Sequence, residues 1–275
     1  MEFLLYTLTA FIFLVFPDGK NEGVMLALSS VKNIVIATLF PMMVLTRGIS
    51  GTPFMKRIEK QIEKKFLWRK LNLSSSLITP VITGILSGFP SSARTIEKLL
   101  EEKKITKKEA SKALALSSAP SPAFVIGIAG KNFLHGSFLF LLSLSFSYFC
   151  VCKVKSTASK TNFDFSRSTF TSALSSSVSS ALNVSGNIIF FTLVTSLFSF
   201  LPRKIILLLS AAAELGSGSA MLKNYPVLLS FLTGFGGISA LCQVKSEAPK
   251  TDIKLYIKIR IASGVLLSAL EFLFF

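Results

Sequence analysis

The sequence predicts an all-α polytopic membrane protein with re-entrant or broken helices. Its 275 residues are 51% hydrophobic and 16% charged, with a mean hydropathy of +0.61, whereas a soluble domain has about 25% charged residues. The apolar residues form blocks between basic segments and lack the two-residue alternation of a β-barrel. Glycine and proline interrupt several blocks, and such interruptions persist in a bilayer only where protein or a water-filled cavity satisfies the freed backbone groups.

The charge distribution also favours a membrane protein. The net charge is +16, from 30 Lys and Arg against 14 Asp and Glu. These basic residues lie between the apolar blocks, and no stacking platform or groove-reading motif accompanies them, so nucleic acid is not the expected partner. They mark cytoplasmic loops and contact anionic lipid, which makes the bilayer the expected partner.

The first half of the chain is divided by its charges. Residues 1–16 form an apolar run that we expect to be the first membrane helix, and residues 23–45 form the second. The block 73–90 lies between two basic segments, 56–70 and 94–112. If both flanks are cytoplasmic, this block enters and returns as a re-entrant hairpin. Within the second basic segment, Thr106 and Glu109 have the spacing of a capping box, which predicts a helix start.

The second half has a similar organisation. Residues 172–185 are rich in Ser and Ala, which predicts a closely packed helix. Residues 187–201 form a span, and residues 226–244 form another. We place Arg203 outside the membrane and Lys245 inside, which requires an odd number of crossings between them. Two apolar blocks lie in this interval, so one of them must be re-entrant. The block 205–222, which is interrupted in its middle, is the candidate.

Two interruptions resemble each other. Gly88 and Pro90 end one apolar run, and the glycines at 234, 236 and 237 interrupt another, each followed by a basic stretch. Broken segments at matching places in two halves point to a transporter-type binding site between them. We therefore divide the chain into an N-terminal membrane helix (1–22), a first half (23–167) and a second half (168–275).

Glu214 is the sharpest candidate for a functional residue. A carboxylate at the bilayer centre costs roughly 2.5–3.5 kcal/mol on insertion scales, so it has a partner or a function. It could couple an ion or proton, or bind solute through a hydrogen bond; it could also cap the helix at the break. The glycines at 216 and 218 belong to the same interruption.

The other candidate residues lie at or just beyond the breaks. Gly88, Pro90, Gly234, Gly236 and Gly237 would expose helix N-termini, which suit an anion, or would serve close helix packing. Neutral hydrogen bonds to a solute could come from Ser91, Ser92 and Gln243, for each of which a structural role is the alternative. Arg94 could pair with an anionic solute or anchor the chain at the cytoplasmic surface. The single histidine, His135, lies in a predicted loop, and we expect it to be solvated.

An ordered set of motifs resembles a known family. The first half contains SGFP (87–90), ITKKEA (105–110) and PAFVIGIAG (122–130), and the second half contains ELGSG (214–218) and GFGG (234–237), followed by QV (243–244). These motifs resemble the YlbJ-type sporulation integral membrane proteins, which carry the nucleoside-recognition or Gate domain. The resemblance implies two Gate-like repeats, a role in sporulation and movement of dipicolinate toward the forespore.

These observations lead to two functional hypotheses. The first is a transporter or permease component for a small polar or anionic solute, with a coupling ion or proton and a homo-oligomeric assembly left open. The second is a non-transporting scaffold for spore-envelope assembly, with the helix at 172–185 as its contact face. No hydrolase, phosphate-binding or zinc motif occurs, so we predict no enzyme, no cofactor and no metal site. The expected location is the cell membrane or the forespore membrane.

Overall fold

The computed structural model describes residues 20–88, 91–159 and 169–274, and in these ranges every regular element is a helix. Four helices are long and apolar enough to cross a membrane: Glu22–Ile49, Phe133–Cys152, Phe170–Ser196 and Pro226–Glu247. This confirms an all-α polytopic membrane protein. The predicted N-terminal membrane helix and Pro90 lie outside the described residues.

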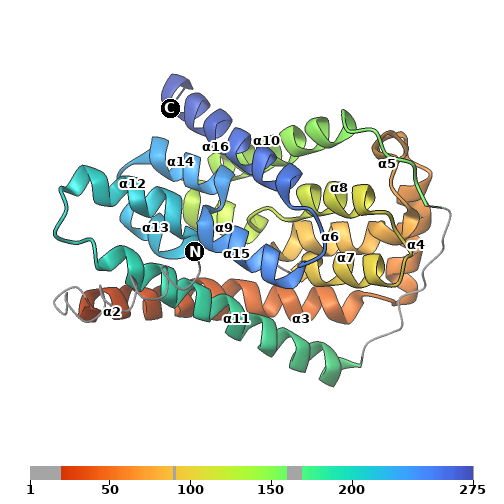
Figure 1. Ribbon diagram of the computed structural model, residues 1–275, viewed down its shortest axis with the longest axis horizontal. Coiled ribbons are helices and arrows are strands. Elements are labelled where there is room, and N and C mark those ends of the chain that lie inside the picture. The colour runs from red at the N-terminus through yellow and green to blue at the C-terminus, as the bar shows by residue number, and fades with distance from the viewer. Residues whose placement is uncertain (1–19, 89–90, 160–168, 275) are drawn as a thin grey trace.

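One layer of the molecule is an antiparallel helix pair, which we call the frame. It consists of α2 (Lys20–Ser30), the π-helix η1 (Val31–Leu39) and α3 (Phe40–Ile49), which form one continuous helix, and of α11 (Phe170–Ser196). Figure 1 shows this pair along one side of the molecule. Gly23 packs directly on Ser196 at one end, and Arg47 donates to Ser180 Oγ at 2.7 Å at the other. The predicted packed helix at 172–185 is confirmed as part of α11.

Two short helices connect the frame to the rest of the chain. They are α4 (Pro53–Glu63) and α5 (Phe66–Leu71), followed by the 3₁₀ turn η2 (Ser75–Leu77). The Thr52 hydroxyl caps α4 by accepting the Met55 N–H at 3.3 Å, and proline at the first helical position is already set for a helix start.

The first helical hairpin consists of α6 (Ile78–Ser87) and α7 (Ser91–Glu101). Gly88 ends α6 with a φ of +76°, a conformation that glycine adopts without strain. Gly84 packs against Ser92, which brings the two arms together. The chain therefore turns back as predicted, but the boundaries differ: the returning arm is α7, which was expected to be a cytoplasmic basic segment. It returns because Ala93, Ile96 and Leu99 give it a buried face.

An interrupted helix and a long helix complete the first half. The predicted capping box is confirmed at the start of α8 (Lys107–Ser117), where the Thr106 and Glu109 side chains bond each other's backbone N–H. Residues 118–121 are not helical, and the chain resumes as α9 (Pro122–Phe124) and the π-helix η3 (Val125–Ala129). The long apolar helix α10 (Phe133–Cys152) follows.

The second half repeats this order of elements. A hairpin is formed by α12 (Arg203–Ala213) and α13 (Leu215–Met221), with its turn at Glu214. The Ser210 hydroxyl lies 3.2 Å from Met221 Sδ, so the arms run side by side as the interrupted block 205–222 predicts. An interrupted helix follows, α14 (Pro226–Phe235) and α15 (Gly237–Glu247), and then the long α16 (Lys254–Phe274).

The two glycine signatures lie in different kinds of break. Gly88 forms a hairpin tip, whereas Gly236, with a φ of +91°, interrupts the α14–α15 helix without folding it back. Element order instead pairs the hairpin at Gly88 with the hairpin at Glu214. The correspondence between residues 88 and 234 that the sequence suggests is therefore not the correspondence of the elements.

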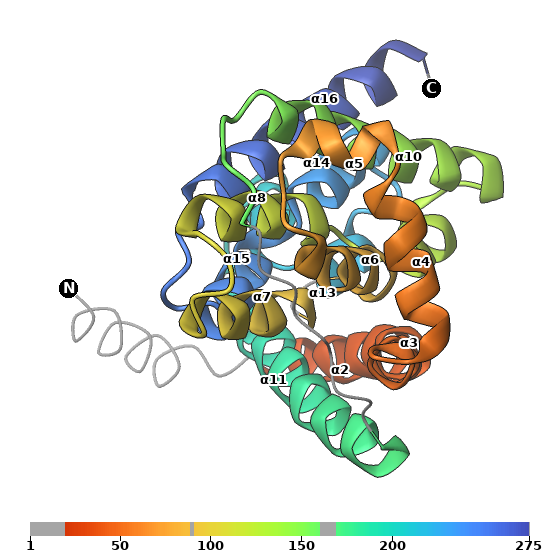
Figure 2. The same ribbon diagram turned by 90° about the vertical axis from the view of Figure 1, so that its right-hand side faces the viewer.

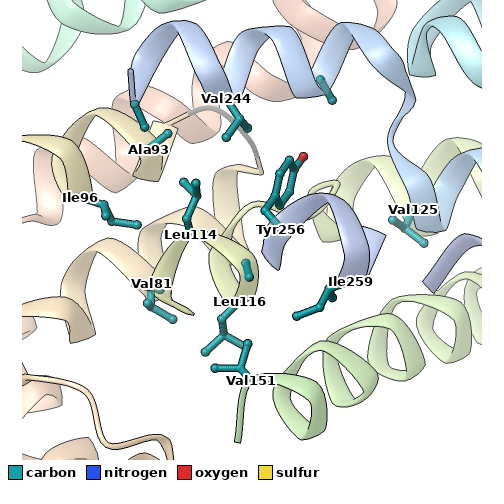
Figure 3. Packing of buried hydrophobic residues seen from close by; sticks show 14 of the residues in the cluster. Val81, Ala93, Ile96, Leu114, Leu116, Val125, Val151, Val244, Tyr256 and Ile259 are labelled. Carbon is teal, nitrogen blue, oxygen red and sulfur yellow. The ribbon is translucent and has the colours of Figure 1, made fainter. Parts of the chain in front are cut away.

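Most of the hydrophobic core lies outside the frame, in a unit that we call the body (α6 to α10 and α12 to α16), and Ile34 of the frame joins the same cluster. Figure 3 shows side chains of α7, α8, α15 and α16 meeting there: Ala93, Ile96, Leu114, Leu116, Val244, Tyr256 and Ile259. The frame has its own smaller cluster of Val35, Met43, Val184 and Ile188. Figure 2 shows the frame as a separate layer below the body.

At the end of the molecule that contains the basic segments, hydrogen bonds join α8 to the neighbouring connecting segments. The fully buried Glu109 carboxylate accepts the N–H groups of Ser74 at 2.9 Å and Ser159 at 3.0 Å, and the Ser159 hydroxyl at 2.6 Å. One turn later, Lys112 Nζ donates to the carbonyl of Val154 at 2.9 Å and also to that of Leu71. Burial opposes ionisation of Glu109, but the hydrogen bonds outweigh it and hold its pKa below the ordinary 4.5.

Substitution at Gly234 tests the close crossing of α14 and α16. A Cβ there would lie 2.6 Å from the Cα of Gly264, so α14 and α16 would have to separate. We expect Gly234→Ala to destabilise the protein by about 1–3 kcal/mol, the usual cost of overpacking. Gly186→Ala on α11 is the control, because no atom lies within 4 Å of its added Cβ. Thermal unfolding in detergent measures both; equal melting temperatures would contradict this account of the crossing.

The hydrogen bonds of Glu109 should make part of the protein's free energy of unfolding sensitive to acid. Because its folded pKa is lowered, its contribution is complete above about pH 4.5 and is lost as the pH falls through the folded pKa. Glu109→Gln leaves buried donors poorly paired and should cost about 1–3 kcal/mol at pH 7. The difference in melting temperature between wild type and variant should shrink below pH 4.5. The exposed Glu102→Gln provides the control, and a gap that is constant with pH would contradict the assignment.

Candidate functional site

The two hairpin tips, the α8–α9 interruption and one residue of α15 meet at one small cavity between the body and the frame. Its volume is about 30 Å³, and a water molecule needs roughly 10–15 Å³ of such a cavity. The hairpin tips contribute Gly88 and the segment from Glu214 to Gly216. The remaining lining residues come from the interrupted helices and the frame: Ile34, Leu39, Pro120, Ser121, Phe124, Val184, Ile188 and Gln243.

Close backbone contacts bring each hairpin tip against an interrupted helix. A Cβ on Gly88 would lie 3.0 Å from the Ser121 nitrogen and 3.3 Å from the Ala119 oxygen. A Cβ on Gly237, whose φ is +84°, would lie 3.0 Å from the Ala213 oxygen. The first tip thus packs on the α8–α9 interruption and the second on the α14–α15 interruption.

Glu214 both caps a helix and faces the cavity. Its side chain is 4% exposed, and Oε2 accepts the Ser217 N–H at 2.6 Å and the Ser217 hydroxyl at 3.0 Å. The Thr192 hydroxyl of the frame donates to Ser217 Oγ at 2.9 Å, which extends the network to α11. None of the ion pairs between described residues includes Glu214. A negative charge on this carboxylate would be stabilised by the N-terminus of α13 and by the Ser217 hydroxyl.

Gln243 presents an unused polar group to the same cavity. Its amide nitrogen donates to Ser239 Oγ at 3.1 Å, and its oxygen is buried without a hydrogen-bond partner in the described part of the chain. If the amide were turned over, the oxygen would accept from Ser239 and the nitrogen would be unused. In either orientation, one end of the amide can bind a polar solute, because a buried polar atom without a partner costs free energy.

Several predicted site residues lie elsewhere. Ser92 bonds Ser117 at 2.9 Å and joins α7 to α8. Gly218 packs on the Ser210 oxygen, and Gly234 packs on Gly264. These three residues have structural roles, which the sequence left open as the alternative for Ser92 and Gly234. Gly236 forms the α14–α15 interruption without lining the cavity.

Arg94 and Ser91 belong to a second, wider cavity beside the first hairpin, the basic vestibule. Its volume is about 390 Å³, and it lies between α6–α7 and the frame. Ser91 bonds Ser87 at the tip. Arg94 forms a bidentate pair with Glu247, at 2.6 and 3.0 Å. Hydroxyl groups and three cations line this vestibule: Arg47, Ser50, Thr79, Thr83, Ser91, Arg94, Thr95, Lys98, Ser172 and Ser176.

A third cavity, the far vestibule, lies at the opposite end of the same seam between frame and body. Its volume is about 240 Å³, and it lies between the frame and the second hairpin. From the frame it is lined by Glu22, Gly23 and Leu26 of α2 and by Thr192, Thr195, Ser196 and Ser199 of α11 and the turn after it; Ile206 and Met221 complete it. Both vestibules were missed from the sequence. The hydroxyl groups spaced along 172–199 are the one signal that could have indicated them.

The structure corrects the expectation for His135, which is buried. Its Nε2 lies 2.8 Å from the Glu271 carboxylate, and its Nδ1 accepts the Lys131 N–H at 3.2 Å. Lys131 Nζ also pairs with Glu271, at 2.7 Å. This cluster lines a pocket of about 350 Å³ away from the seam, so it is separate from the three cavities above.

Comparisons with protein-family models, curated proteins and solved structures found no match to this chain. Among the described residues, no group of three His, Cys, Asp or Glu side chains could hold a metal ion. The assignment of the site therefore depends on its geometry, and the family resemblance stays a prediction.

Two substitutions at Glu214 separate its capping role from its charge. Glutamine keeps a side-chain oxygen that can accept the Ser217 N–H, so Glu214→Gln should melt close to the wild type. Alanine removes the cap, so Glu214→Ala should cost about 0.5–2 kcal/mol. Thermal unfolding in detergent measures both. If both variants were equally destabilised, the charge and not the cap would stabilise the hairpin.

Proposed function

We propose that the protein is a transporter that moves a small polar solute along the seam between the frame and the body. The supporting observation is the arrangement of three cavities along one seam. The two vestibules of about 390 and 240 Å³ lie at opposite ends, and the cavity of about 30 Å³ lies between them. The hairpin tips close the path at its middle, as a transporter between two open states requires.

The packing supports relative motion of the two layers. The frame is held together by its own cluster, with Val35, Met43, Val184 and Ile188, while most of the remaining core lies within the body. Each half of the chain supplies a hairpin, an interrupted helix and a long helix, and we propose that these are the two Gate-like repeats. Rocking of the body against the frame would open the central cavity to one vestibule at a time.

Glu214 and Gln243 are the proposed solute contacts. Both line the central cavity, and both have polar groups that are not paired with a charged side chain. The carboxylate could bind a donor group of the solute or carry a coupling proton or cation. The amide supplies a neutral hydrogen bond beside it. A site of this kind favours polar over apolar solutes, because an apolar solute would leave both groups unpaired.

The family resemblance supplies a finer proposal. It suggests a sporulation protein of the cell or forespore membrane whose solute is dipicolinate, a small anion. The basic vestibule is compatible with an anion, because its lining includes Arg47, Arg94 and Lys98 and no acidic side chain. Arg94 pairs with Glu247 and Lys98 lies 3.9 Å from Glu102, so an anion at the entrance would compete with these two carboxylates for the cations.

The scaffold hypothesis keeps only part of its proposed contact face, because one side of α11 is buried while Val178 and Leu182 on the other side are 42% and 67% exposed. The Ser- and Ala-rich stripe of α11 packs on the other helix of the frame, with Ser177 and Ser180 bonded to Arg47. No cavity is needed for a scaffold, whereas three cavities lie along the seam, so transport is the function that the geometry supports best.

Uptake into liposomes tests the proposal. The purified protein should accumulate radiolabelled dipicolinate, and Glu214→Gln should reduce the rate by about tenfold or more, the effect of losing one hydrogen bond to a charged group. Glu63→Gln should leave the rate unchanged, because this exposed side chain lies outside the three cavities. Wild-type uptake equal to that of protein-free liposomes, for dipicolinate and for a panel of polar solutes, would reject transport.

A blocking variant tests the path itself. A Cβ on Gly216 would lie 3.0 Å from Ile34 Cδ1 across the central cavity. Gly216→Val should therefore obstruct the path, while Gly186→Val on a helix face without neighbours should not. If the folded Gly216→Val protein transports at the wild-type rate, the solute does not pass through this cavity.

A further inference from the structure

The two connecting helices present an exposed surface that is both basic and apolar, which we call the α4–α5 surface. Three large apolar side chains are exposed on it: Phe54 (63%), Phe66 (74%) and Leu67 (63%). Six exposed cations surround them, and Glu63 is the one exposed acidic residue on these two helices. The cations are Arg57, Lys60, Lys64, Lys65, Arg69 and Lys70.

The opposite face of these helices is anchored in the protein. Met55 and Trp68 are buried. Glu59 accepts a hydrogen bond from the Thr79 hydroxyl of α6, and the Tyr148 hydroxyl of α10 donates to the Leu67 carbonyl at 2.9 Å. The helices therefore cannot rotate to bury the exposed aromatic side chains, and their outer face needs an environment that is apolar and anionic.

The position of the surface identifies this environment. The α4 and α5 helices lie between the end of α3 and the start of α6, at the end of the molecule where the first hairpin begins (Figures 1 and 2). The other basic connections, after α7, α10 and α15, are cytoplasmic by the same charge rule. A short amphipathic helix with basic residues beside aromatic ones lies in the plane of the membrane interface.

We propose that the α4–α5 surface binds the headgroups of anionic phospholipids in the cytoplasmic leaflet. The cations contact the headgroup phosphates, and Phe54, Phe66 and Leu67 enter the boundary of the acyl chains. Each basic residue at an anionic membrane surface contributes about a fivefold preference. This proposal is independent of the transported solute, because the surface faces away from the seam and none of its residues lines the three cavities.

Trp68 provides a direct measurement. It is the single tryptophan of the chain and lies on α5, so lipids with brominated acyl chains quench its fluorescence only when they bind nearby. In nanodiscs of phosphatidylcholine, brominated phosphatidylglycerol should quench Trp68 more than brominated phosphatidylcholine at equal mole fraction. The triple variant Arg57→Gln, Lys60→Gln, Lys64→Gln should weaken this preference by about fivefold for each residue. All three side chains are exposed, so we expect the variant to fold.

A matched control separates the surface from net charge. The triple variant Lys103→Gln, Lys107→Gln, Lys108→Gln removes the same charge from exposed positions at the connection after α7 and should retain the preference. Equal quenching of the wild type by both lipids would overturn the proposal, as would an equal loss in the two triple variants. Inorganic phosphate at constant ionic strength should not compete; if it did, a soluble anion and not a lipid would be the ligand.

Discussion

The fold depends on satisfying the backbone where helices break inside the membrane. Hydrocarbon offers no hydrogen bonds, so each break needs a protein or water partner. The chain brings its breaks together in pairs: the Gly88 tip packs on the interruption at Ala119 and Ser121, and the second tip packs on the interruption at Gly237. At the second tip, Glu214 satisfies the Ser217 N–H with its own side chain. The central cavity is the space that remains when these breaks converge.

This constraint also explains the composition of the seam. The frame presents apolar side chains at the level of the breaks, namely Ile34, Leu39, Val184 and Ile188, and mainly hydroxyl groups toward both ends. The π-helix η1 supplies two of the apolar residues, and π-helical segments are common at functional sites. An apolar surface opposite polar hairpin tips makes few directional bonds across the seam. The proposed shift of the body along the frame would therefore break one buried hydrogen bond at this level, the bond from Thr192 to Ser217.

The sequence predicts the membrane class, the break at Glu214, the helix at 172–185 and the start of α8, because each has a local signal: hydropathy, an acid within an apolar run, small residues or a capping box. Charge bias misplaced the returning arm of the first hairpin, because α7 is basic on one face and buries Ile96 and Leu99 on the other. Gly234 and Gly236 are neighbours with different roles, and only the backbone conformation distinguishes packing from interruption. The partner of His135 is 136 residues away, beyond any pattern in a single sequence.

The buried acids show why Glu214 differs from a structural carboxylate. Glu97 accepts two N–H groups and a hydroxyl from Lys250 and Thr251, Glu109 accepts N–H groups from three segments, and Glu271 pairs with Lys131. Each of these joins distant parts of the chain, so its removal would separate them. Glu214 is bonded within its own hairpin, to Ser217, and faces a cavity. A carboxylate held by the N-terminus of its own helix would move with the hairpin and break no ion pair among the described residues. In the proposed transport, Glu214 could therefore exchange a hydrogen-bond partner for a solute or an ion.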